Sequence, residues 1–140
     1  MVTAQKTVVI LDTCYSGLFI SRPYLISDNK NKMDSAIARL RHGGGCAFIT
    51  SSSSRQVSLE GYKQYGVLTY SLLQGMKGDE NPQKSDGFVT IHDLSSHVRD
   101  EVPDITQERW HYAQVPTSLL YNDNFSFCCR KGYDLPGCQK

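Results

Sequence analysis

Residues 7–17 read Thr7-Val8-Val9-Ile10-Leu11-Asp12-Thr13-Cys14-Tyr15-Ser16-Gly17. The apolar run at the start is typical of a β-strand buried on both faces. It is followed at once by a carboxylate, a thiol and a hydroxyl, and then by a glycine that lets the chain turn. In open parallel sheets, ligands and reactive groups gather just beyond the carboxyl ends of the strands. Cys14 is therefore a candidate nucleophile, and the alternative is a small buried residue at a turn.

The composition bounds the class of protein. The chain has 140 residues, 39% of them hydrophobic and 21% charged, which predicts one soluble globular domain. A net charge of +1 gives no broad attraction to nucleic acid or to a membrane, and no apolar stretch is long enough to span one. The N-terminus lacks an apolar signal segment and the cysteines number five, so we expect reduced thiols in the cytoplasm. We place Cys46 in the core.

The pattern after residue 17 predicts an α/β fold. We expect a polar loop over 18–33, a short helix over 36–41, a buried strand over 46–50, a helix from 67 to about 78, a helix that begins at Thr90 and ends at Pro103, and an edge strand over 115–121. This order predicts a mostly parallel sheet flanked by helices. We assign residues 1–125 to the domain. The tail 126–140 has no periodic pattern and is expected to be disordered or to cover another surface.

Several motifs occur in the order found in a known family. The string Asp12-x-Cys14-x-Ser16-Gly17 is followed by Gln56-Val57-Ser58-Leu59-Glu60, Gly66-Val67-Leu68-Thr69, Asp86-Gly87-Phe88-Val89-Thr90 and Gln114-Val115-Pro116. Together they resemble the caspase-like cysteine peptidases, and the metacaspases and their bacterial relatives in particular. The resemblance extends over roughly residues 7–121. Leu68 stands where the family has an aromatic residue, and residues 56–60 depart conservatively from its Gln-Thr-Ser-Ala-Asp.

The resemblance implies a cysteine endopeptidase with a caspase-like layered fold. Cys14 would form an acyl-enzyme with a peptide carbonyl, and its backbone N–H would help to hold the oxyanion. Asp12 matches the position at which basic-specific members keep an acid in the pocket for the residue before the cleaved bond, which implies cleavage after Arg or Lys. The alternative for Asp12 is a carboxylate that caps the following turn. Ser51 and Ser52 would border the same pocket, and the alternative is an ordinary solvated loop.

The catalytic histidine of the family belongs to a strand upstream of the nucleophile, roughly 50 residues earlier in caspases. Only thirteen residues precede Cys14, so the chain resembles the C-terminal portion of the domain without its first strands. We expect an upstream segment or a separate chain to supply the histidine, and little turnover by this chain alone. The histidines present are interpreted as helix or loop residues: His42, His92, His97 and His111. The strand over 7–11 is expected to have an open edge.

A second function is compatible with the same motifs. A non-catalytic caspase-like module would bind or regulate an active relative and carry an inert thiol. The intact residues Asp12, Cys14, Ser16 and Gly17 favour the peptidase. We expect protein or peptide substrates and no cofactor. Residues 28–34 lack the dense carboxylate spacing of a calcium loop, so no metal is assigned, although some metacaspases need calcium.

Overall fold

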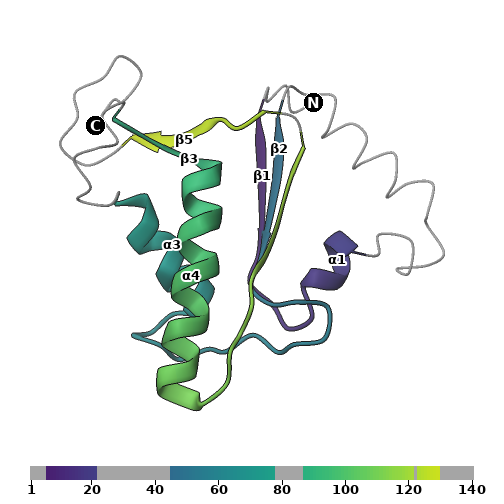
Figure 1. The fold of residues 1–140 in the computed structure, drawn as a ribbon, viewed down its shortest axis with the longest axis vertical. Coiled ribbons are helices and arrows are strands. Elements are labelled where there is room, and N and C mark those ends of the chain that lie inside the picture. Colours follow the sequence, from purple (N-terminus) through teal and green to yellow (C-terminus); the bar gives the residue numbers. More distant parts are fainter. Residues whose placement is uncertain (1–5, 22–44, 78–86, 122, 130–140) are drawn as a thin grey trace.

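The computed structural model describes residues 6–21, 45–77, 87–121 and 123–129 (Figure 1). The elements, in chain order, are β1 (Thr7–Leu11), α1 (Gly17–Ser21), β2 (Cys46–Thr50), α3 (Val67–Met76), β3 (Phe88–Thr90), α4 (Ile91–Trp110), β4 (Thr117–Tyr121) and β5 (Ser126–Cys129). Figure 1 shows α3 and α4 on one side of the main sheet and α1 on the other, near the end where β1 and β2 finish. The predicted α/β class is confirmed.

The main sheet is mixed. Its strand order is β1-β2-β4, with β1 parallel to β2 and β4 antiparallel to β2. Two long helices that run in opposite directions, α3 and α4, connect β2 to β4, so β4 starts at the end of the sheet where β2 stops. A single crossover helix would have produced a parallel strand. The expectation of a mostly parallel sheet is therefore not confirmed, and β3 and β5 form a separate antiparallel pair.

Burial differs sharply between the strands of the main sheet. All five residues of β2 are buried, because β2 lies between two strands and under the helices. Its Ile49 packs into a core of aliphatic side chains from the two long helices and β3, namely Val67, Leu68, Leu72, Val89, Leu94, Val98 and Val102. Among the described residues, β1 is an edge strand, and its Ile10 is 42% exposed. The sequence expectation that residues 7–11 form a strand buried on both faces is therefore wrong.

Helix α4 begins as predicted and ends later than predicted. The Thr90 hydroxyl accepts from the N–H of Asp93, whose carboxylate accepts from the N–H of Thr90 in return. Pro103 lies inside the helix rather than at its end. The helix continues because Val102 and Thr106, on either side of the proline, are both fully buried against the rest of the domain. It ends at His111, which has left-handed backbone with φ 54°.

The remaining expectations concern residues 17–21, residues 36–41, the tail and the cysteines. Residues 17–21 form α1 where a loop was expected, and the predicted helix over 36–41 lies outside the described residues. Residues 126–129 form β5, which pairs with β3, whereas no regular structure was expected there. Cys129 is disulfide-bonded, so the expectation that every thiol is reduced is wrong. Among the described residues, no helix has the length and apolar character needed to cross a membrane.

Candidate active site

The loop of residues 12–17, here called the Cys14 loop, follows β1 and is held by hydrogen bonds to buried serine hydroxyl groups. The backbone carbonyl of Thr13 accepts from the hydroxyl of Ser51 at 3.0 Å and from that of Ser52 at 3.4 Å. Ser16 joins the same cluster, because its hydroxyl lies 3.2 Å from that of Ser51 and accepts from the N–H of Ser52. These contacts fix the carbonyl that immediately precedes Cys14.

Ser51 and Ser52 are fully buried in the described structure. Their hydroxyls point into the Cys14 loop, so the structure gives both residues a role in supporting that loop. The interpretation as an ordinary solvated serine run is therefore wrong for these two positions. Direct contact of either side chain with a substrate stays a prediction.

The turn of the Cys14 loop is made by Tyr15 and not by the glycine. Tyr15 has φ 58°, in the left-handed region that side chains rarely adopt. Its N–H donates to the carbonyl of Gln56 at 2.9 Å, which anchors this strained residue. Gly17 is needed for a different reason, because the backbone of residues 52–54 passes close to it. A Cβ atom at position 17 would lie 2.7 Å from backbone atoms of Ser52, Ser53 and Ser54. The sequence signal for a glycine was correct, but its reason is packing.

Cys14 is exposed, and its polar contacts within the described residues come from Ser58 alone. The N–H of Ser58 donates to Sγ at 3.4 Å, and Sγ lies 3.9 Å from the carbonyl of Ser58. The backbone N–H groups of Tyr15, Ser16 and Gly17 are engaged within the fold. The backbone N–H of Cys14 has no partner among the described residues.

Asp12 is half-buried and accepts three hydrogen bonds. The hydroxyl of Ser58 donates to Oδ1 at 3.0 Å, and the N–H and hydroxyl of Thr69 both donate to Oδ2. Thr69 lies in the first turn of α3, whose N-cap residue Gly66 supplies no side-chain cap, so Asp12 caps this helix from a distance. The alternative that Asp12 caps the turn after β1 is therefore wrong. No basic side chain in the described residues is paired with this carboxylate.

Two glutamines clamp the chain segments around the site. Gln114 is fully buried; its Oε1 accepts from the N–H of Leu59 and its Nε2 donates to the carbonyl of Ser51, both at 2.7 Å. Gln56, which is only partly buried, bridges the backbone of residues 113 and 115 in the same way. The sequence motifs pointed to both positions without indicating this role. Ser58 and Thr69 also lay inside quoted motifs, but nothing in the sequence showed that they bind Asp12.

A strained turn borders the first turn of α3. Lys63 and Gln64 have φ 47° and 74°, the pattern of a type I′ turn, between Tyr62 and Tyr65, which pair with each other. The ammonium of Lys63 donates to the hydroxyl of Tyr70 at 3.0 Å, and this bond raises the pKa of Lys63 above its ordinary value. The turn is thereby tied to the residue that follows Thr69.

The described histidines do not contact Cys14. His92 lies in the first turn of α4. This turn is beside β3 and β5, at the opposite end of the main sheet from the Cys14 loop (Figure 1). His97 faces Glu101 on the same helix at 3.4 Å, and His111 is the exposed C-cap of that helix. His42 lies outside the described residues. The arrangement therefore presents a thiol and a carboxylate without a neighbouring histidine among the described residues.

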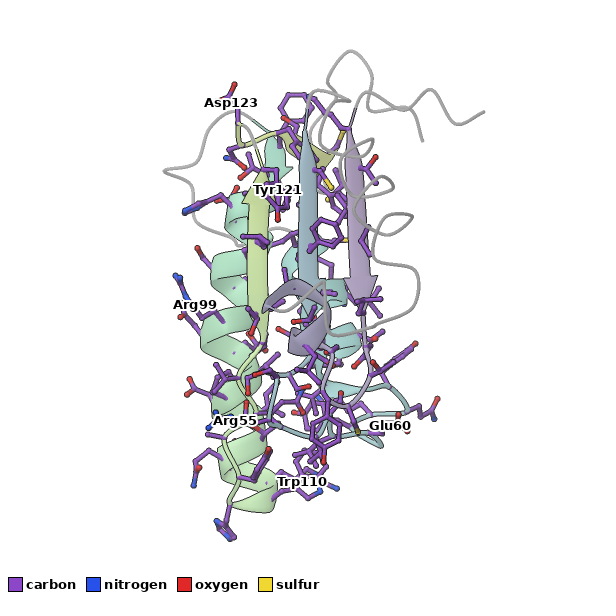
Figure 2. The ribbon with its side chains drawn as sticks, turned by 90° about the vertical axis from the view of Figure 1, so that its right-hand side faces the viewer. Arg55, Glu60, Arg99, Trp110, Tyr121 and Asp123 are labelled. Atoms are coloured by element: carbon purple, nitrogen blue, oxygen red, sulfur yellow. The ribbon has the colours of Figure 1, made fainter. Side chains whose placement is uncertain are left out.

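The chemical groups of the site are concentrated at one end of the sheet. Figure 2 shows Arg55, Glu60 and Trp110 at this end, and Tyr121 and Asp123 at the opposite one. Within the described ranges, no cluster of three or more His, Cys, Asp or Glu side chains could hold a metal ion. Residues 28–34, considered for calcium, lie outside those ranges.

Comparison with known proteins identifies the chain at family level. The sequence profile of the C14 peptidases, described as the caspase domain, matches residues 1–122. The match includes the Cys14 loop, both glutamines and Asp12. No curated protein and no solved structure matches the chain.

Proposed function

This chain belongs to the caspase-domain family of C14 peptidases, and from that premise we propose that it is the nucleophile-bearing part of an endopeptidase that cleaves after Arg or Lys. The family is one of cysteine-type peptidases. The metacaspase-like character, the basic specificity and the role of each residue are the content of the proposal.

The proposed chemistry uses the exposed thiol. Cys14 transfers its proton to a histidine supplied by another segment or chain, and the thiolate attacks the substrate carbonyl. A C–S bond forms, the peptide C–N bond breaks, and the amine leaves with the proton that the histidine returns. The N–H of Cys14, which has no partner in the described part of the chain, supports this route, because it can donate to the oxygen on which negative charge develops. Water then hydrolyses the acyl-enzyme.

The specificity proposal depends on one observation: Asp12 and Cys14 are both held by Ser58, and Asp12 has no cationic partner among the described residues. A half-buried carboxylate without a counter-ion favours a ligand that carries positive charge. Oδ2 already accepts two hydrogen bonds and Oδ1 accepts one, so a basic side chain finds its free position on Oδ1. We therefore expect a single-oxygen contact, which serves Lys as well as Arg.

The test compares two peptide chloromethyl ketones that differ only at the residue before the reactive group, Arg in one and its neutral isostere citrulline in the other. We expect Cys14 to react about tenfold faster with the Arg probe, as one charge-assisted hydrogen bond allows. Asp12→Asn should remove this preference, whereas Asp100→Asn, on the exposed face of α4, should retain it.

Two outcomes contradict the proposal. Equal labelling by both probes in the unmodified chain would exclude Asp12 as a specificity residue. A thiol at position 14 that reacts no faster than free glutathione with either probe, even after the histidine-bearing segment is added, would favour the non-catalytic module. Cleavage is then measured with the histidine-bearing segment added. In that complex Cys14→Ala should abolish activity, and full activity of that variant would exclude Cys14 as the nucleophile.

A further inference from the structure

We propose that Ser58 is the positioning residue of the nucleophile, and that Asp12 acts a second time by anchoring it. This inference rests on the proposed function, because it assigns a part of the same site. Ser58 is the residue through which the carboxylate and the thiol are joined: its backbone contacts Sγ of Cys14 and its hydroxyl contacts Oδ1 of Asp12.

The backbone contact favours the reactive form of the thiol. A hydrogen bond donated to sulfur stabilises the negatively charged thiolate over the neutral thiol, and the thiolate is the form that attacks. In the neutral thiol, the S–H can point at the carbonyl of Ser58, 3.9 Å away. After the proton leaves, the N–H at 3.4 Å is the described contact that remains attractive to sulfur. The peptide unit of Ser58 is therefore oriented for both protonation states.

The side-chain contact keeps that peptide unit in place. Ser58 lies between two residues that are anchored by hydrogen bonds. The backbone carbonyl of Gln56 accepts from the N–H of Tyr15 in the Cys14 loop, and the N–H of Leu59 donates to the side chain of Gln114. Between these two anchors, the 3.0 Å bond from the Ser58 hydroxyl to Asp12 is what fixes Ser58 itself. Deleting the hydroxyl leaves the backbone donor in the chain but removes the restraint that aims it at Sγ.

The experiment measures the rate at which iodoacetamide alkylates Cys14 at fixed pH, by intact mass and peptide mapping. We expect Ser58→Ala to react about fivefold more slowly, as weakening of one hydrogen bond to a charged group implies, and Ser58→Thr, which keeps the hydroxyl, to react like the unmodified chain. Ser54→Ala, in the nearby serine run of residues 51–54, is the matched control. Labelling of the fully buried Cys46 reports loss of folding in each variant.

A second pair of variants tests the anchor and covers the case in which Ser58→Ala does not fold. Asp12→Asn and Asp12→Ala both remove the negative charge, but only Asn keeps an oxygen that can accept from Ser58. We expect the Ala variant to react more slowly than the Asn variant. Equal rates in this pair, or a Ser58→Ala rate equal to that of the unmodified chain with Cys46 protected, would overturn the inference. Iodoacetamide carries no charge, so failure of the Arg preference alone would reject the specificity proposal and leave this one standing.

Discussion

Gln114→Ala should cost far more stability than the same change at Gln56, and the structure explains the difference. Gln114 is fully buried, and its side-chain amide satisfies the N–H of Leu59 and the carbonyl of Ser51, each at 2.7 Å. Truncation leaves the buried carbonyl of Ser51 and the partly buried N–H of Leu59 without these partners. An unsatisfied buried polar group costs about 1–3 kcal/mol. We therefore expect a loss of about 2–5 kcal/mol in the free energy of unfolding.

Gln56 is the matched control because it bridges two backbone groups in the same manner, with contacts at 2.8 and 3.1 Å, but is partly exposed. Water replaces the lost contacts there, so Gln56→Ala should cost about 1 kcal/mol or less. Urea unfolding followed by circular dichroism gives both values. Because Gln114 holds Ser51 and Leu59, the residues beneath and beside the Cys14 loop, its Ala variant should also lower the alkylation rate of Cys14. If the two variants lose the same free energy of unfolding to within about 0.5 kcal/mol, the argument from burial is refuted.

Three further substitutions follow from backbone geometry. Gly17→Ala places a Cβ 2.7 Å from three backbone atoms, so we expect a loss of about 2 kcal/mol or more in urea unfolding, and a near-neutral result would contradict the packing role. Gly66→Ala brings a Cβ to 2.5 Å from Oδ2 of Asp12, which should displace that carboxylate and reduce the preference for an Arg probe over a citrulline probe; an unchanged preference would count against Asp12. Gln64 has a φ of 74°, which glycine adopts without strain, so Gln64→Gly should stabilise the fold by about 1 kcal/mol and raise the melting temperature. An unchanged melting temperature would show that the turn is not strained.

Local sequence signals predicted the three strands of the main sheet and the two long helices of this chain, but not α1, β3 or β5. The apolar runs at 7–11 and 46–50 form β1 and β2, and the Thr90–Asp93 pair caps α4 as expected. Strand direction was not predictable in this way, because it depends on how many helices cross between β2 and β4. The prediction that α4 ends at Pro103 was wrong for a related reason. The local preference of proline against helix was outweighed by the burial of residues on both sides of it.

The site was predictable only in part. Cys14, Asp12 and the two serines were found from their place after a strand and from the motifs. The positions of Asp12 and Cys14 depend on Ser58 and Thr69, which are 46 and 57 residues away from Asp12 along the chain. No periodicity or spacing encodes such contacts. The sequence therefore indicated candidate residues for the chemistry, whose roles stay predictions, while the residues that contact and orient them became visible only in the fold.

The long sequence separations within the site also bear on folding kinetics. The bond from Gln114 to Ser51 joins residues 63 apart, and that from Thr50 to Thr117 joins residues 67 apart. Each closes a long loop, so its entropic cost must be met before the contact becomes favourable. The α3–α4 pair is built from nearer segments and can form earlier. We expect the Cys14 loop to be among the last parts of this domain to assemble during refolding, with protection of Cys46 acquired before the reactivity of Cys14 reaches its native value.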